Sequence, residues 1–307
     1  MNGMIFWRCL HRQNTAPNDA QCAGLNLQNL KSLHLSSGFL ALYVLSMPAY
    51  ALIRLSADAT STAIATAATA GFLFLFSLAH CIETRGWLRA TLMLAAAFTI
   101  ALLMEYLGSK HGFLFGNYAY TDNLGFKALN QVPAIIPIAW FMMLYPSWEM
   151  GRLLTRRFSG VMHHVSCIMV AALAMTAWDL SLDPRMVADG NWIWLDGGLY
   201  FGIPLSNFAG WFITSALIYG FWSRIDKAEW GDQREKFVEP HSRLPIWAYI
   251  ITWIGESMAN ALFWGGPAVA LCVFVAMGLF GGPALRLLIH SNRTTRFQRV
   301  TDGEMKG

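Results

Sequence analysis

Hydrophobic segments of about 20 residues recur along this 307-residue chain, and short polar stretches separate them. A helix of about 20 apolar residues is long enough to cross the hydrocarbon core of a bilayer. The pattern predicts an all-α, polytopic helical bundle with eight transmembrane helices at residues 32–53, 63–82, 88–107, 132–150, 161–182, 203–222, 245–264 and 267–290. Gly281, Gly282 and Pro283 interrupt the last segment, so the alternative is a seven-helix arrangement with a re-entrant final segment.

Composition and charge support a membrane protein and predict its orientation. Hydrophobic residues make up 55% of the chain and charged residues 13%, against about 25% charged in typical soluble domains. With the N-terminus in the cytoplasm and eight crossings, cytoplasmic parts carry eighteen of the 22 lysines and arginines. Cytoplasmic loops are usually enriched in basic residues. We therefore expect a multi-pass protein of the cell membrane with a cytoplasmic N-terminus, and no nucleic-acid partner.

The same pattern gives the domain organisation. We expect residues 1–30 to form a polar N-terminal tail, residues 31–290 a single transmembrane domain, and residues 291–307 a basic C-terminal tail. The charged loop 224–243 is expected to be a cytoplasmic connector.

One stretch, residues 174–211, carries the most unusual polar residues. Asp179 and Asp183 are four residues apart, and therefore on one face of a helix. Because the residue before a proline avoids the α region, Pro184 predicts that this helix ends near Leu182. That ending would place Asp179 inside the membrane and Asp183 at the membrane surface. Four tryptophans surround these acids in the sequence: Trp178, Trp192, Trp194 and Trp211.

Further polar residues fall at the same predicted outer depth of other helices. An ionisable side chain that faces lipid is costly, so these groups should face one another or water inside the bundle. A purely structural polar network between helices is the competing interpretation. The residues concerned are Glu105, Asn207, Glu256 and Asn260, of which the last two share a helix face.

A second unusual loop, residues 105–120, lies on the same side of the membrane. It is rich in glycine and aromatic residues, and Tyr118 and Tyr120 alternate as in an extended strand. An interfacial aromatic belt is the alternative. His111 is the one histidine near the acidic residues. A di-iron membrane oxygenase would need several histidines that converge on one site, so we expect no metal and no other cofactor.

Buried acids among aromatic rings suit carbocation chemistry on a lipid. An acid in an apolar site favours its protonated form and can deliver a proton to an alkene. Tryptophan and tyrosine faces stabilise the resulting cation, and a second carboxylate can hold the water that attacks it.

Four runs of sequence resemble the integral-membrane carotenoid biosynthesis family, which includes carotenoid 1,2-hydratases such as bisanhydrobacterioruberin hydratases. They are EYLGSKHGFLFGNYAYTD at 105–122, VPAIIPIAWFMMLYP at 132–146, TAWDLSLDPRMVADGNWIWLDGG at 176–198 and YFGIPLSNFAGWF at 200–212. The resemblance implies addition of water to the terminal C1–C2 double bond of an acyclic carotenoid, a hydro-lyase reaction. The substrates would be an isoprenoid lipid and water, and association with other carotenoid-pathway enzymes is possible.

The residues themselves suggest the roles. We expect Asp179 to donate the proton, and Asp183 or Glu105 to orient water and accept its proton. The other candidates would line the substrate site or position water and the acids: Trp178, Trp192, Trp194, Tyr200, Asn207, Trp211, Tyr118, Tyr120, His111, Glu256 and Asn260.

Two other functions fit part of the pattern. Asp179 and Asp183 resemble half of the paired aspartate motifs with which intramembrane prenyltransferases bind magnesium diphosphate. A lipid-binding or transport protein could use the acids as a proton relay. The product distinguishes the three: a hydratase adds one water, a prenyltransferase adds a five-carbon unit, and a binding protein changes no mass.

Overall fold

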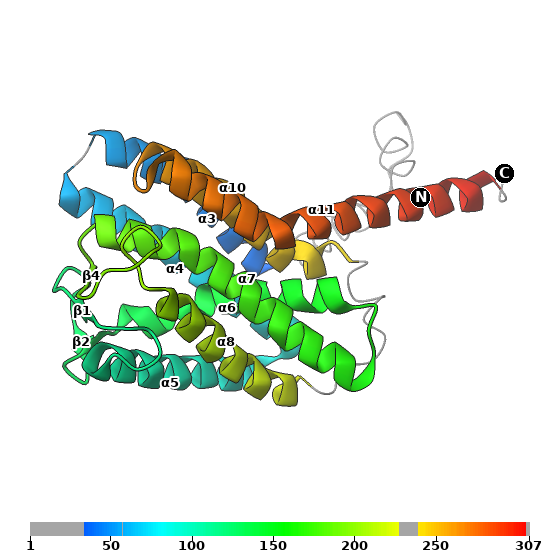
Figure 1. Ribbon diagram of the computed structural model, residues 1–307. Helices are drawn as coiled ribbons and strands as arrows, with labels where there is room; N and C mark the ends of the chain where they lie inside the picture. Colours follow the sequence, from blue (N-terminus) through cyan, green and yellow to red (C-terminus); the bar gives the residue numbers. More distant parts are fainter. Residues whose placement is uncertain (1–33, 57, 227–238, 305–307) are drawn as a thin grey trace, which may run out of the picture. The chain divides into compact units, whose positions relative to one another are not determined.

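The computed structural model describes residues 34–56, 58–226 and 239–304, and one compact unit begins at Ser36. The predicted tail 1–30 and part of the predicted loop 224–243 lie outside the described residues. Within them, eight long helices form a bundle (Figure 1), which confirms the predicted fold class. The helices are α3 (Leu35–Ser56), α4 (Ala59–Arg85), α5 (Trp87–His111), α6 (Ile135–Thr155), α7 (Gly160–Ala188), α8 (Leu205–Ile225), α10 (Leu244–Leu262) and α11 (Gly266–Glu304).

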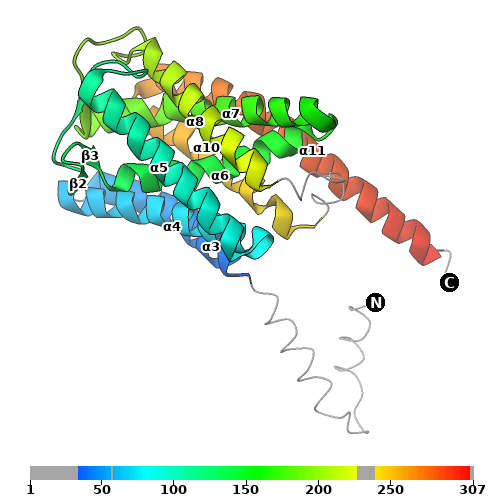
Figure 2. The same cartoon turned by 90° about the horizontal axis from the view of Figure 1, so that it is seen from below.

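Helix α6 lies inside the bundle. It packs against α4, α5, α7, α10 and α11, and nearly all of its residues are buried. A helix that is buried on every side needs no polar face, and most of α6 is apolar. Seen from below, the other long helices surround it (Figure 2). Because α6 contacts five helices, it forms the centre of the bundle beside the site described below.

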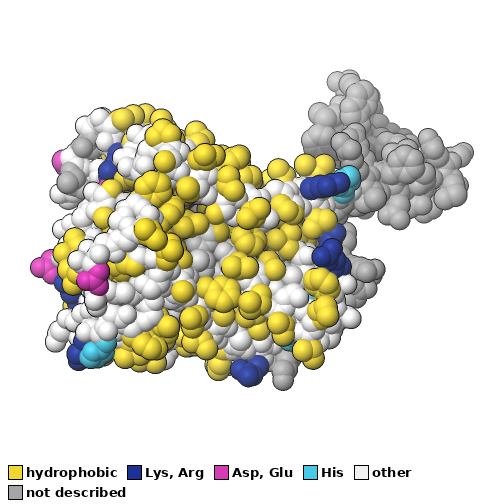
Figure 3. Space-filling model, in the orientation of Figure 1, with side chains coloured by type: hydrophobic (Ala, Val, Ile, Leu, Met, Phe, Trp, Pro, Cys, Tyr) yellow, Lys and Arg dark blue, Asp and Glu magenta, His cyan; other side chains and the backbone are white. Residues whose placement is uncertain are grey.

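The outer helices have the length and surface that a bilayer requires. Five helices are long and apolar enough to cross a membrane: α3, α4, α5, α7 and α11. Hydrophobic side chains cover the middle of the face shown in Figure 3, and charged side chains gather toward its two ends. The chain is therefore a multi-pass membrane protein.

Two prolines that the sequence suggested as helix breaks lie inside continuous helices. Helix α7 continues through Pro184 to Ala188, so the predicted end near Leu182 is wrong. Proline has no N–H to donate to the carbonyl four residues earlier, which is that of Leu180. The hydroxyl of Tyr200 donates to this oxygen at 2.9 Å instead, so the helix continues without an unpaired carbonyl there. Helix α11 also continues through Pro283 and runs past residue 290.

Short strands close one end of the bundle. β1 (Tyr118–Tyr120) pairs antiparallel with β4 (Trp192–Trp194), and β2 (Lys127–Ala128) pairs with β3 (Val132–Pro133). The first pair joins the loop after α5 to the loop after α7 (Figure 1). Tyr118 faces Trp194 across the pair, and Tyr120 faces Trp192. The register therefore fixes four aromatic side chains at the ends of α5 and α7.

The other end of the bundle contains a buried network of charges. The Arg85 guanidinium contacts Glu149, lies 3.1 Å from the carboxylate of Asp226 and donates to the Tyr145 hydroxyl at 2.7 Å. Arg152 contacts Glu149 at 3.1 Å. Buried ions are stabilised only when partners surround them. Here two arginines and two acids balance one another and join α4, α6 and the end of α8.

Phe115 is wedged between two helices where glycines make room for its ring. A Cβ at Gly108 of α5 or at Gly210 of α8 would each approach a Phe115 ring carbon to 2.6 Å. This distance is shorter than real contacts allow, and the ring is almost fully buried. The two glycines thus allow α5 and α8 to pack closely against Phe115 in the loop that leads to β1.

Gly210→Ala is expected to destabilise the protein by about 1–3 kcal/mol, the usual effect of overpacking a core. Thermal unfolding in detergent would measure it. Gly220→Ala on the same helix is the matched control, because nothing lies within 4 Å of a Cβ there. Equal midpoints for both variants would contradict the wedge.

Candidate active site

Asp179 and Asp183 lie on one face of α7, as predicted, and Asn207 of α8 bridges them. The Asn207 side-chain nitrogen donates to Oδ2 of Asp179 at 2.8 Å and to Oδ2 of Asp183 at 2.7 Å. All three residues are almost completely buried. One amide therefore holds both acids in a fixed geometry. Asp183 does not lie at the end of the helix, because α7 continues past it to Ala188.

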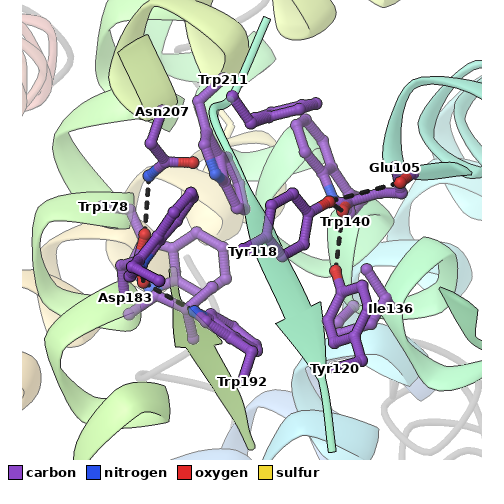
Figure 4. Close-up of a pocket in the computed structure, with 14 residues that line it drawn as sticks. Glu105, Tyr118, Tyr120, Ile136, Trp140, Trp178, Asp183, Trp192, Asn207 and Trp211 are labelled. Carbon is purple, nitrogen blue, oxygen red and sulfur yellow. Dashed lines mark hydrogen bonds between the residues drawn. The ribbon is translucent and has the colours of Figure 1, made fainter. Parts of the chain in front are cut away.

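The second oxygen of Asp183 faces two tryptophans of β4. Trp192 donates its indole N–H to Oδ1 at 2.7 Å, and Trp194 donates at 2.9 Å. With Asn207, Asp183 accepts from three donors (Figure 4). Three converging donors stabilise a charged carboxylate.

Glu105 of α5 has a similar set of partners on the opposite side of the site. Its Oε2 accepts from the hydroxyls of Tyr118 at 2.6 Å and Tyr120 at 2.7 Å, and its Oε1 accepts from the Trp140 indole at 3.0 Å. Burial, and then the negative charge of Glu105, raise the pKa of both tyrosines well above the ordinary value. Both phenols therefore remain protonated donors at physiological pH.

Between Glu105 and Asp183 lies a small cavity walled by aromatic rings. Tyr118 stands between the two acids in Figure 4. Trp140 and Trp211 stack at 4.1 Å between ring centroids, and Trp178 meets Trp211 nearly at a right angle. The volume of about 30 Å³ is roughly that of one water molecule. The aromatic wall consists of Phe115, Tyr118, Tyr120, Trp140, Trp178, Trp192, Trp194 and Trp211.

Asp179 lies behind this wall. It is fully buried, and it is absent from the cavity lining that includes Asp183. Among the described residues, its Oδ1 has no hydrogen-bond partner, and neither has the indole nitrogen of Trp178. Asp179 thus has one donor where Asp183 has three. A buried carboxyl group with so few donors is poorly stabilised as an anion.

The structure places four other predicted residues outside the cavity. Tyr200 bonds the Leu180 carbonyl, and His111 is exposed at the end of α5. Glu256 accepts from Ser181 at 2.9 Å, and Asn260 donates to the same hydroxyl at 2.7 Å. Ser181 is two residues from each aspartate and therefore points to the opposite side of α7. The expectation that Glu256 and Asn260 join the acids of the cavity is not met.

Two residues of the site, Trp140 and Phe115, were not predicted from the sequence. Trp140 is a direct partner of Glu105, and Phe115 lines the cavity. Trp140 sits in an apolar run with no polar neighbour to single it out, whereas the glycines on both sides of Phe115 were a usable signal of a tight loop. Within the described residues, no further ionisable group lines the cavity besides Glu105, Asp183 and the two tyrosines.

The fold and the site describe a membrane protein with an acidic, aromatic chamber at one end of its helices. The family model "Carotenoid biosynthesis protein" matches residues 40–280, which include all of the site. The chain belongs to this family and therefore takes part in carotenoid biosynthesis.

One curated protein is similar to part of this chain. Over 131 residues the chain is 30% identical to the bisanhydrobacterioruberin hydratase of Haloarcula japonica. The aligned part covers 42% of this chain and 43% of that protein, less than half of the relative's length. No solved structure matches the chain.

Proposed function

We propose that the protein adds water to the terminal C1–C2 double bond of an acyclic carotenoid and forms a tertiary alcohol. The observation that supports this proposal is the pair of carboxyl groups, Glu105 and Asp183, on opposite sides of an aromatic cavity. The hydratase named above supports the same reaction class. The scheme makes the protein a hydro-lyase and uses no cofactor.

The Asp179–Asp183 pair supplies the proton in this scheme. Two acids held by one amide do not both ionise readily, because like charges repel in a buried site. The pair therefore shares a proton and is best treated as one titrating unit. Asp179, which has the fewer donors, holds the shared proton at rest. Asp183 faces the cavity and passes this proton to C2 of the alkene, which replaces the direct donation expected from Asp179. The C1–C2 π electrons form the new C–H bond, which leaves a tertiary cation at C1.

Water completes the reaction from the Glu105 side. A water oxygen bonds to C1, and one of its protons passes to the carboxylate on that side, Glu105. The rings of Trp140, Trp178 and Trp211 stabilise the positive charge between these two steps. The proton that the carboxylate gains equals the one that the pair gave up, so the enzyme returns to its starting state after exchange through solvent.

The cavity must widen for the substrate to enter. Its volume of about 30 Å³ suits a water molecule and is far below that of an isoprenoid end group. The rings of β1 and β4 sit on short strands that join two loops, and in this scheme the two strands move apart to admit the substrate. Closure behind the substrate would exclude bulk water, which protects a reactive cation.

Expression in a host that makes an unhydrated acyclic carotenoid tests the proposal. In water labelled with ¹⁸O, we expect a pigment heavier by one labelled water, with the label in a tertiary alcohol. A five-carbon addition that depends on magnesium would instead establish a prenyltransferase, and unchanged pigment would favour a binding or transport protein. Either result would reject hydration.

A further inference from the structure

A second and larger cavity lies on the other side of α7. Its volume is about 490 Å³, which falls in the usual range for small-molecule sites. Apolar side chains of α3 and α10 form most of its wall, including Met47, Ile254 and Leu262. Arg185, two residues beyond Asp183, lines this cavity while Asp183 lines the first. Helix α7 therefore separates two chambers at the same end of the bundle.

The polar end of the second cavity is built around Arg185. Its guanidinium lies 4.5 Å from the ring centroid of Trp264 and 5.3 Å from that of Tyr50. It contacts Glu256 at 3.5 Å, a long separation for an ion pair, and Thr66 at 3.4 Å. The arginine and the glutamate leave the polar end without net charge. A ligand for this end should therefore be neutral.

Several polar atoms in the cavity wall lack partners. Within the described part of the chain, no hydrogen bond is formed by the Tyr50 hydroxyl, the Thr69 hydroxyl, Nε of Arg185 or Nε1 of Trp264. All four atoms are buried, and Tyr50 as a whole is only 7% exposed. Buried donors are nearly always paired in folded proteins. The Arg185 and Trp264 groups can only donate, so the missing partner must offer an acceptor.

We propose that this cavity binds the end of an isoprenoid alcohol, with the chain along the apolar wall and the oxygen at Trp264 and Arg185. An alcohol oxygen accepts from these two donors, and its own hydrogen can bond to the Tyr50 or Thr69 oxygen. The neutral polar end disfavours a phosphate. The choice of an isoprenoid among neutral lipids rests on the proposed function, whereas the demand for an uncharged acceptor rests on the cavity alone.

Binding of geranylgeraniol, a C20 isoprenoid alcohol, to the purified full chain in detergent tests this site. We expect saturable binding that is at least about fivefold tighter than that of the hydrocarbon with the same skeleton, the effect of one or two hydrogen bonds. Trp264→Phe keeps an aromatic ring, although a smaller one, but removes the N–H, and should weaken alcohol binding about fivefold. Trp253→Phe is the matched control, because its indole already donates to the Phe274 carbonyl.

Ala259→Phe should place a phenyl ring inside the cavity and weaken binding of both the alcohol and the hydrocarbon. Equal affinity for both ligands, unchanged binding in Ala259→Phe, or a tightly held diacyl lipid that the alcohol cannot displace would each overturn the proposal. Hydration of pigment is measured separately. Loss of alcohol binding with hydration intact refutes only the second site, whereas absent hydration with specific alcohol binding refutes only the proposed reaction.

Discussion

Replacing Asp183 by asparagine is expected to lower the yield of hydrated pigment about 100- to 10,000-fold, the contribution of a well-placed acid or base. The variant cannot transfer a proton to the alkene. Its side chain also offers one acceptor oxygen where the carboxylate receives bonds from Trp192, Trp194 and Asn207. Pigment hydrated per amount of membrane protein, measured by mass spectrometry, reports the loss.

Asp196→Asn provides the matched control. Asp196 is an exposed acid shortly after β4, and among the interactions described it bonds only to Asn117. Its hydration yield should equal that of the wild type. Thermal unfolding in detergent separates loss of chemistry from loss of fold, because the expected Asp183 variant retains a cooperative transition. A folded Asp183→Asn protein that still hydrates pigment at the normal rate would exclude this residue as proton donor.

Replacing Arg85 by methionine is expected to destabilise the fold by about 3–5 kcal/mol, the usual result of removing one partner from a buried ion pair. Asp226 would lose its bonds to the guanidinium, and within the described part of the chain Glu149 would keep only Arg152 as an ion-pair partner. The unfolding midpoint in detergent should fall sharply. The remaining folded fraction should still hydrate pigment, because the network lies at the end of the bundle away from the cavity.

Arg224→Met is the control for this substitution. Arg224 is exposed near the same end of the bundle, and substitutions at such positions usually change stability by less than about 0.5 kcal/mol. Similar midpoints for the Arg85 and Arg224 variants would show that the charge network contributes little to stability.

Most of the helical arrangement could be predicted from hydrophobic segment length, since a bilayer imposes nearly the same span on every crossing. All eight predicted segments correspond to long helices. Local rules were less reliable. Pro184 breaks the hydrogen-bond ladder as expected, yet the helix continues because Tyr200, sixteen residues later, satisfies the freed carbonyl. A contact of that kind depends on tertiary packing and has no local signal.

The candidate site shows the same division. The spacing of Asp179 and Asp183 was enough to place both on one face, and Asn207 and Glu105 were identified from their predicted depth. Depth alone could not tell which side of a helix Glu256 faces, and the structure places it beyond α7. The role of Trp140 was also out of reach, since a tryptophan in an apolar run gives no hint of its partner. The absence of a metal requirement and the membrane orientation stay predictions.

The pairing of β1 with β4 ties the evolution of two distant loops together. Side chains alternate along a strand, so a slip of one residue would turn a whole set of rings to the other face. Tyr118 and Tyr120 would then leave Glu105, or Trp192 and Trp194 would leave Asp183. A single-residue insertion in either loop is therefore expected to be rare among active homologues. A chimaera between two of them should exchange both loops as one unit.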